Sequence, residues 1–169
     1  MNPFRPDYRY PSLAEVPVEE FASRGFRGAL LDIDNTLVVY GVYDKIPEQN
    51  MEWLRRAEAV GVKCLLYSNA TQRKIEILKK VSGLPAVPKV YKPAWKLIGK
   101  ALDMIGCTKD QAMLIGDQIC TDILGGNWGG VTTVLIEPLT DTDWPGTKIL
   151  RMIEWFFLPD RRPWYRKRR

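Results

Sequence analysis

Apolar residues along the chain form two kinds of pattern, short runs and helical stripes. The short runs predict five β-strands, at residues 29–33, 62–67, 87–90, 112–115 and 132–136. Stripes with an apolar residue at every third or fourth position predict helices over residues 47–60, 72–81, 93–105 and 150–158. Trp95 lies off the apolar stripe of its helix, so we expect its side chain to be exposed.

Strands and helices therefore alternate along most of the chain. This alternation predicts an α/β fold of parallel β-α-β units, with a three-layer, doubly wound (Rossmann-like), mainly parallel five-stranded sheet. A length of 169 residues suits one domain. We expect that domain to span residues 1–160, with residues 1–20 as a lead-in segment that is irregular over residues 1–11. Residues 161–169 form a basic aromatic tail.

The charge is distributed unevenly. Lys and Arg number 25 against 20 Asp and Glu, and six of the cations lie in residues 161–169. The rest of the chain then has 19 cations against 20 anions, so the net positive charge belongs to the tail. A nearly neutral body offers no distributed basic stripe for nucleic acid, whereas a basic aromatic end suits an anionic membrane surface.

Several classes of chemistry are excluded by composition. The chain has no histidine, which rules out Ser-His-Asp and Cys-His catalysis and His-ligated zinc. Its three cysteines are far apart, so a disulfide framework is not expected. No run of 18 apolar residues predicts a membrane-spanning helix. The glycines at 125, 126, 129 and 130 lack a following Gly-Lys-Ser/Thr, so we interpret them as turn glycines and not as a phosphate-binding loop.

Polar side chains collect where the predicted strands end. In a doubly wound sheet, ligands bind at the carboxyl ends of the strands. Those ends supply Asp32, Asp34, Ser68, Asn69, Lys92, Asp117 and Asp122.

Together these residue types can carry out phosphoryl transfer. Asp32 can act as a nucleophile towards phosphorus, and Asp34 can protonate the leaving oxygen and later activate water. A divalent cation, for which Mg²⁺ is the natural choice, would offset repulsion between these acids and an anionic substrate. Asp117 completes a ligand set with Asp32 and Asp34, and Asp122 binds or orients that set.

Three further residues answer the charge on the transferring group. Lys92 supplies a fixed positive charge. Ser68 supplies a hydroxyl group, and Asn69 supplies a backbone amide near a helix start. We therefore expect all three to bind the phosphate of the substrate.

Four motifs in this order resemble those of the haloacid dehalogenase (HAD)-like phosphatase superfamily, subfamily IIIA. They are Asp32-x-Asp34-x-Thr36-Leu37, Ser68-Asn69, Lys92-Pro93 and Gly116-Asp117-x-x-x-x-Asp122. Residues 116–127 are similar to the YqeG group and the related phosphatidylglycerophosphate phosphatases. The resemblance implies an aspartyl-phosphate on Asp32, Asp34 as general acid and base, phosphate binding by Ser68 and Lys92, and Mg²⁺ held by Asp32, the Asp34 carbonyl and Asp117. We also expect Thr36, in the first motif, to bind substrate. One position departs from the group, because Trp128 stands where a basic residue is usual.

The spacing of the motifs bears on the substrate. Residues 38–61 and 70–91 are too short to hold a cap subdomain as well as the predicted elements, so we expect a capless enzyme with an open site. An open site suits a phosphate on something large, and the favoured reaction is dephosphorylation of phosphatidylglycerophosphate to phosphatidylglycerol in phospholipid biosynthesis. Two alternatives stay open: a soluble phosphatase for nucleotide or sugar phosphates, and an RNA- or ribosome-associated binding protein with little turnover. We expect a cytoplasmic protein, peripherally associated with the inner face of the membrane, with no obligate protein partner.

Overall fold

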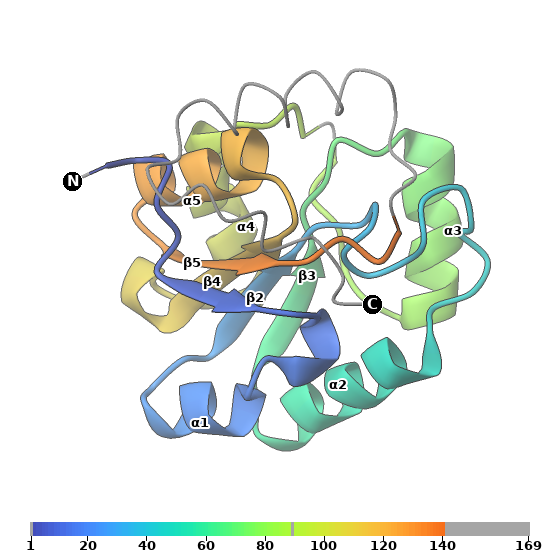
Figure 1. Cartoon of the computed structure of the whole chain (residues 1–169), viewed down its shortest axis with the longest axis horizontal. Helices are drawn as coiled ribbons and strands as arrows, with labels where there is room; N and C mark the ends of the chain where they lie inside the picture. Colours follow the sequence, from blue (N-terminus) through green and yellow to red (C-terminus); the bar gives the residue numbers. More distant parts are fainter. Residues whose placement is uncertain (1, 89, 141–169) are drawn as a thin grey trace, which may run out of the picture.

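A five-stranded parallel sheet forms the centre of the molecule. The computed structural model describes residues 2–88 and 90–140 (Figure 1). Every strand pair in the sheet is parallel, and the order across it is β1-β5-β4-β2-β3. The strands are β1 (Tyr8–Tyr10), β2 (Gly28–Leu31), β3 (Lys63–Leu66), β4 (Ala112–Gly116) and β5 (Thr132–Ile136).

Helices cover both faces of this sheet. In Figure 1, α1 and α2 lie on one side of the strands and α4 and α5 on the other. The helices are α1 (Val18–Ser23), α2 (Glu48–Ala59), α3 (Gln72–Ser82), α4 (Ile98–Ile105) and α5 (Leu124–Gly129). Short 3-10 turns occur at Leu13–Glu15, Trp95–Leu97 and Lys109–Gln111, and a π-helical turn at Ile119–Ile123 precedes α5.

Alternate residues of the central strands feed two separate cores. Leu30 and Leu114 pack in the cluster that contains the apolar face of α4. Leu31 and Ile115, their chain neighbours, pack in the cluster that contains α1, α2 and α3. Since side chains alternate across a strand, a fully apolar strand such as β4 must be covered on both faces. The three-layer, doubly wound α/β fold predicted from the sequence is confirmed.

One predicted strand is wrong and another was missed. The described residues of this segment, 87, 88 and 90, form no strand, and the bridge next to it, between Leu66 and Ala86, is an isolated one. Pro85 precedes this short run and Pro88 lies within it, and proline has no N–H to donate to a sheet.

The fifth strand comes instead from the segment that we expected to be an irregular lead-in. Tyr8 and Tyr10 pair in register with Val134 and Ile136 of β5. Both tyrosine rings also lie edge-on against Phe21 of α1, at centroid distances of 5.0 and 6.5 Å. Tyr8–Tyr10 therefore form a strand of the sheet, so the expectation of an irregular segment over residues 1–11 is wrong there.

Two helices also differ from expectation. The predicted helix over residues 93–105 begins as a 3-10 turn, and the α-helix starts only at Ile98. Three of the four presumed turn glycines lie within α5, and only Gly130, with φ of 75°, ends that helix in the left-handed region. Two predictions, the helix over residues 150–158 and the tail at residues 161–169, lie outside the described residues.

The connections between the strands leave the carboxyl end of the sheet open. Residues between β2 and β3 contain one helix, α2, and those from β3 to Lys92 contain one helix, α3. Over the described residues, the expected capless arrangement is therefore confirmed. Among the described residues, no helix is long and apolar enough to span a membrane.

Candidate active site

Three buried carboxylates meet where strand order reverses. From β2 the chain winds to β3 on one side and then crosses to β4 on the other, so β2 and β4 flank the switch point. Asp32 follows β2, Asp117 follows β4, and Asp122 lies in the π-helical turn Ile119–Ile123. One carboxylate oxygen from each of the three lies within 4.8 Å of the others. The structure thus brings together acids that are up to 90 residues apart in sequence.

A buried lysine bridges two of these acids. The ammonium group of Lys92 donates a hydrogen bond to Oδ1 of Asp32 and another, of 2.6 Å, to Oδ1 of Asp122. Only 2% of the Lys92 side chain is exposed. Burial acts to lower the pKa of Lys92, but the charges of Asp122 and Asp32 outweigh it and the pKa is raised. Lys92 therefore stays charged at neutral pH.

Asp122 is held by its neighbours as a fixed support for that lysine. Its second oxygen, Oδ2, accepts a hydrogen bond of 3.1 Å from the backbone N–H of Gln118. The carboxylate packs directly over Gly116, where a Cβ atom would lie 2.2 Å from Oδ2. Glycine is needed at position 116 because any side chain would displace Asp122. Since both oxygens of Asp122 are engaged, the geometry favours an orienting role over a ligand role for this residue.

The residues after β3 hold the segment that carries Lys92 in place, which the sequence did not predict. Ser68 lies two residues after the end of the edge strand β3, and its side chain is buried. Asn69, predicted to offer its backbone amide, uses its side chain to accept a hydrogen bond from the backbone N–H of Lys92. Tyr67 adds a second link, because its hydroxyl donates a 2.6 Å hydrogen bond to the carbonyl oxygen of Ala94. These bonds tie the segment that carries Lys92 to the end of β3.

Asp34 has a different environment from Asp32. A quarter of its side chain is exposed, and the hydroxyl of Tyr43 donates a 2.7 Å hydrogen bond to its Oδ1. The ammonium group of Lys74 lies 3.9 Å from its Oδ2. Burial raises the pKa of the Asp34 carboxyl above its usual value, although Tyr43 and Lys74 both act to lower it. A carboxyl with a raised pKa is suited to give up a proton during a reaction near neutral pH.

Lys74 and Tyr43 belong to a cluster that sequence reasoning missed. The Lys74 ammonium lies over two aromatic rings, 4.3 Å from the centroid of Tyr43 and 5.3 Å from that of Tyr40. Tyr40 and Tyr43 follow the end of β2 by nine and twelve residues, whereas Lys74 is on α3. No local spacing in the sequence could have placed this cation over Asp34.

The loop after β2 is held in place by hydrogen bonds from a buried asparagine of α2. Asn50 of α2 donates hydrogen bonds of 3.2 and 2.8 Å to the carbonyl oxygens of Thr36 and Leu37. Thr36, predicted to bind substrate, is completely buried. Asn35 adopts a left-handed backbone conformation with φ of 59°, which asparagine tolerates better than most residues. This local geometry turns the chain sharply between Asp32 and the exposed segment that carries Tyr43.

The carboxylate cluster has the composition that Mg²⁺ requires. Three buried carboxylates lie together and Lys92 pairs with two of them, so this group of described side chains carries more negative than positive charge and offers hard oxygen donors. Mg²⁺ binds through one or two carboxylates together with water and substrate phosphate. Asp32 and Asp117 fit such a set, with Lys92 and Asp122 beside it.

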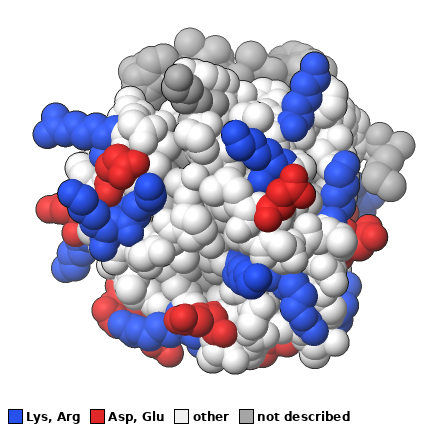
Figure 2. Space-filling view, turned by 180° about the vertical axis from the view of Figure 1, so that it is seen from behind, with Lys and Arg blue, Asp and Glu red and all other residues white. Residues whose placement is uncertain are grey.

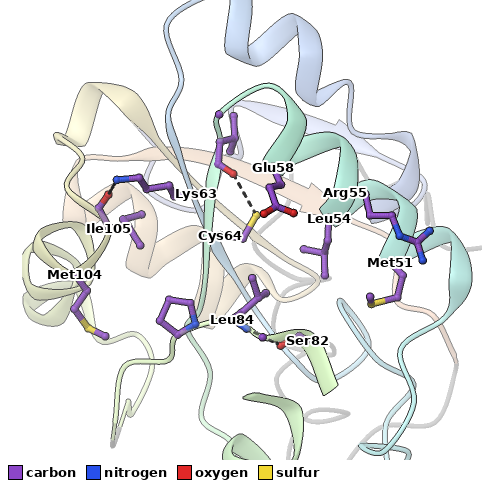
Figure 3. Close-up of a pocket in the computed structure, with 14 residues that line it drawn as sticks. Met51, Leu54, Arg55, Glu58, Lys63, Cys64, Ser82, Leu84, Met104 and Ile105 are labelled. Carbon is purple, nitrogen blue, oxygen red and sulfur yellow. Dashed lines mark hydrogen bonds between the residues drawn. The ribbon is translucent and has the colours of Figure 1, made fainter. Parts of the chain in front are cut away.

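A cavity of about 600 Å³ lies elsewhere, at the amino end of the sheet (Figure 3). Its wall comes from the start of β3 and the C-terminal ends of α2, α3 and α4, and includes Leu54, Cys64 and Met104. Burial raises the pKa of the Cys64 thiol to about 12, so this cysteine is not a nucleophile at neutral pH. Lys63 at its edge already donates to the carbonyl oxygen of Ile105 at 3.0 Å. None of the candidate phosphoryl-transfer residues lines this cavity.

Comparisons with known proteins agree with the geometry. The model of the HAD-hydrolase-like family matches residues 90–138. The "Probable phosphatase YqeG" of Bacillus subtilis is 30% identical over 151 residues, which cover 89% of this chain and 87% of that protein. The chloroplastic phosphatidylglycerophosphate phosphatase 1 of Chlamydomonas reinhardtii is 28% identical and matches 90% of this chain, which spans 60% of that protein's length.

Solved structures show the same fold at low sequence identity. An uncharacterized protein from Listeria monocytogenes superposes with a TM-score of 0.54 at 20% identity, covering 71% of this chain and 85% of its own. A protein of Mesorhizobium loti described as a HAD-like phosphatase superposes with a TM-score of 0.51 at 13% identity, covering 89% of this chain and 90% of its own. From its relatives and its fold, the chain belongs to the phosphatases of the HAD-like hydrolase superfamily, in the group that includes YqeG.

Proposed function

We propose that this protein is a Mg²⁺-dependent phosphomonoester hydrolase that works through a phosphoryl group on Asp32, with phosphatidylglycerophosphate as its substrate. The observation that carries the reaction is the bridge of Lys92 between Asp32 and Asp122, next to Asp117, at the switch point of the sheet. This bridge holds one oxygen of Asp32, so the nucleophile is oriented before substrate arrives.

In the first half-reaction, a carboxylate oxygen of Asp32 forms a bond to the substrate phosphorus as the ester P–O bond breaks. The leaving oxygen takes the electron pair of that bond and accepts a proton from the carboxyl group of Asp34. The raised pKa of Asp34 supports this step, because the group must be protonated when substrate binds.

In the second half-reaction, the carboxylate of Asp34 accepts a proton from a water molecule whose oxygen attacks phosphorus. The bond between phosphorus and Asp32 breaks, which releases phosphate and restores both acids. Lys92 has three N–H donors, and two of them bond Asp32 and Asp122. Its third N–H and the hydroxyl of Ser68 are assigned to the phosphate oxygens.

Mg²⁺ would supply positive charge between the acids and the transferring phosphate. We assign its ligands as Asp32, the backbone carbonyl of Asp34 and Asp117, with Asp122 holding the set in place. Asn69 contributes indirectly, by fixing the backbone of Lys92.

Three observations support a phosphate carried on a lipid. Two relatives are named as phosphatidylglycerophosphate phosphatases, although this chain spans only 60% and 48% of their lengths. Among the described residues, the connections at the carboxyl end of the sheet hold no cap. Tyr91 and Trp95, on either side of Lys92 in the chain, are 79% and 42% exposed, which confirms the expected exposure of Trp95. Aromatic side chains with polar edges are suited to the interface between water and lipid.

Nucleic acid is a weaker candidate. Figure 2 shows one face of the molecule, on which Lys and Arg side chains are interspersed with Asp and Glu and form no basic stripe. The basic tail at residues 161–169 could contact an anionic membrane, and peripheral association with the inner membrane face remains part of this proposal.

The test is phosphate release from phosphatidylglycerophosphate in mixed micelles, from AMP and from glucose 6-phosphate, each with Mg²⁺ and with EDTA. We expect Mg²⁺-dependent release that is fastest from the lipid and is abolished in Asp32→Asn. Asp103→Asn, at an exposed acid on α4, is the matched control and should retain full activity. Faster release from either soluble ester would contradict the lipid assignment, and equal release by Asp32→Asn would contradict the nucleophile.

A further inference from the structure

A cation lies beside the acid that serves the leaving group. The ammonium group of Lys74 is 3.9 Å from Oδ2 of Asp34, beyond the short contact of a direct charged hydrogen bond. It is held over the rings of Tyr43 and Tyr40, and 29% of its side chain is exposed. Lys74 is thus a positioned charge, and it is partly open to solvent.

Tyr43 contacts both Asp34 and Lys74, and the contact of its ring with Lys74 accounts for the position of the lysine near Asp34. Tyr43 bonds Asp34 through its hydroxyl and supports Lys74 through its ring. A lysine needed only as an ion-pair partner for Asp34 could approach to hydrogen-bond distance without a platform of two rings. The rings act to hold the ammonium near the acid while leaving N–H donors for another group.

The proposed reaction indicates which group the N–H donors of Lys74 would bind. Asp34 protonates the leaving oxygen, so the remainder of the leaving group must extend from Asp34 outwards. Lys74 is the charged side chain that lies against Asp34 on this outer, partly exposed side. A leaving group that carries a second phosphate on a short linker would bring that anion to the ammonium group.

We propose that Lys74, framed by Tyr40 and Tyr43, binds a second anionic phosphate of the substrate, carried on the leaving group a few atoms beyond the ester oxygen. This inference rests on the proposed function, since it uses Asp34 as the general acid. It identifies the preferred substrate class as phosphomonoesters with a neighbouring phosphodiester or second phosphate. Lys74 then acts as a residue that determines specificity.

The sharpest test uses two soluble substrates with the same reacting group. sn-Glycerol 3-phosphate has one phosphate, whereas the deacylated head group of phosphatidylglycerophosphate has the same phosphomonoester and an added phosphodiester. We expect the wild-type enzyme to favour the two-phosphate substrate in kcat/KM by about 10-fold or more. Fructose 1,6-bisphosphate, with no phosphodiester, distinguishes a general second-phosphate site from one that is specific for the lipid head group.

Variants separate this role from a merely structural one. Lys74→Met should remove most of the preference, chiefly through a higher KM for the two-phosphate substrate, and Lys74→Arg should retain it. Tyr43→Phe loses the hydrogen bond to Asp34 but keeps a ring under the cation, so it should slow both substrates by the same factor. Lys80→Met makes the same change of charge at an exposed position of α3 and is the matched control. It should leave both rates unchanged.

Each outcome decides the matter. If the wild-type enzyme shows no preference, or if Lys74→Met slows both substrates equally, the second-phosphate site is wrong and Lys74 only orients Asp34. If neither substrate is hydrolysed while another phosphomonoester is, the preference itself is overturned. If no phosphomonoester is hydrolysed with Mg²⁺ present, the proposed function fails as a whole. Should Lys74→Met fail to fold, the wild-type preference and Lys74→Arg decide the question without it.

Discussion

The packing of Asp122 over Gly116 gives a quantitative test of the site. In Gly116→Ala, the new Cβ would lie 2.2 Å from Oδ2 and 2.7 Å from Cβ of Asp122. Ordinary contacts need about 3.5 Å, so the carboxylate has to move by more than about 1 Å. Forcing a group into a packed interior usually costs about 1–3 kcal/mol of the free energy of unfolding.

The same movement should damage catalysis. It breaks the 2.6 Å hydrogen bond that Asp122 makes to Lys92. A hydrogen bond to a charged group contributes about 1.5–3 kcal/mol. If this support is needed in the transition state, kcat falls by roughly 10- to 150-fold.

The assay is urea unfolding together with steady-state phosphate release, and Gly99→Ala is the matched control. Gly99 lies near the start of α4 with nothing within 4 Å of the position of its missing Cβ. Alanine there should stabilise the protein by about 0.5–1 kcal/mol because glycine is a poor helix former. If Gly116→Ala has the same free energy of unfolding and the same kcat as the wild-type protein, the conclusion that Asp122 supports Lys92 is contradicted.

Three further predictions concern stability and membrane contact. Asn50→Ala leaves two buried carbonyl oxygens of the loop after β2 without their donor and should lower the free energy of unfolding by about 1–3 kcal/mol, whereas Gln49→Ala, at an exposed neighbour, should have little effect in the same urea titration. Hydrogen bonds from Arg56 lower the pKa of Glu19 from 4.5 to about 2, so this pair stabilises the fold above pH 4.5 and its contribution is lost as the pH falls from 4.5 towards 2. Because the Glu19 side chain is about half exposed, Glu19→Gln should cost less than about 1 kcal/mol at pH 7, and the difference from wild type should shrink by pH 3. Deleting residues 160–169 should weaken sedimentation with anionic vesicles while hydrolysis of a soluble phosphate ester is unchanged; equal sedimentation would contradict the membrane role.

The parts of the fold that could be predicted are those whose residues satisfy local rules. The strands β2, β3, β4 and β5 were each placed within one or two residues, since apolar runs of that length cannot be solvent-exposed. β1 was missed because a three-residue edge strand has too few side chains to show a period, and its stability comes from pairing with β5 and from Phe21.

The candidate site also contains residues that the sequence predicts and residues that only the structure shows. Its acids and lysine could be predicted, because they follow strand ends that a parallel sheet brings to one edge. Asn50, Tyr43 and Lys74 could not, because their roles depend on side-chain contacts between segments 9 to 40 residues apart. The side-chain contact of Asn69 was missed, since only the structure shows its oxygen accepting a hydrogen bond from the backbone N–H of Lys92, while the predicted role of its backbone amide stays a prediction.

The central claim is that an oxygen of Asp32 becomes bonded to phosphorus. The most direct measurement is a crystal structure of the full chain with beryllium fluoride and Mg²⁺, in which the beryllium adduct mimics an aspartyl-phosphate. The account predicts the adduct on Asp32, with Lys92 within hydrogen-bond distance of a fluoride and the cation between Asp32 and Asp117. An adduct on another side chain, or none in crystals of enzyme that hydrolyses phosphate esters, would contradict it.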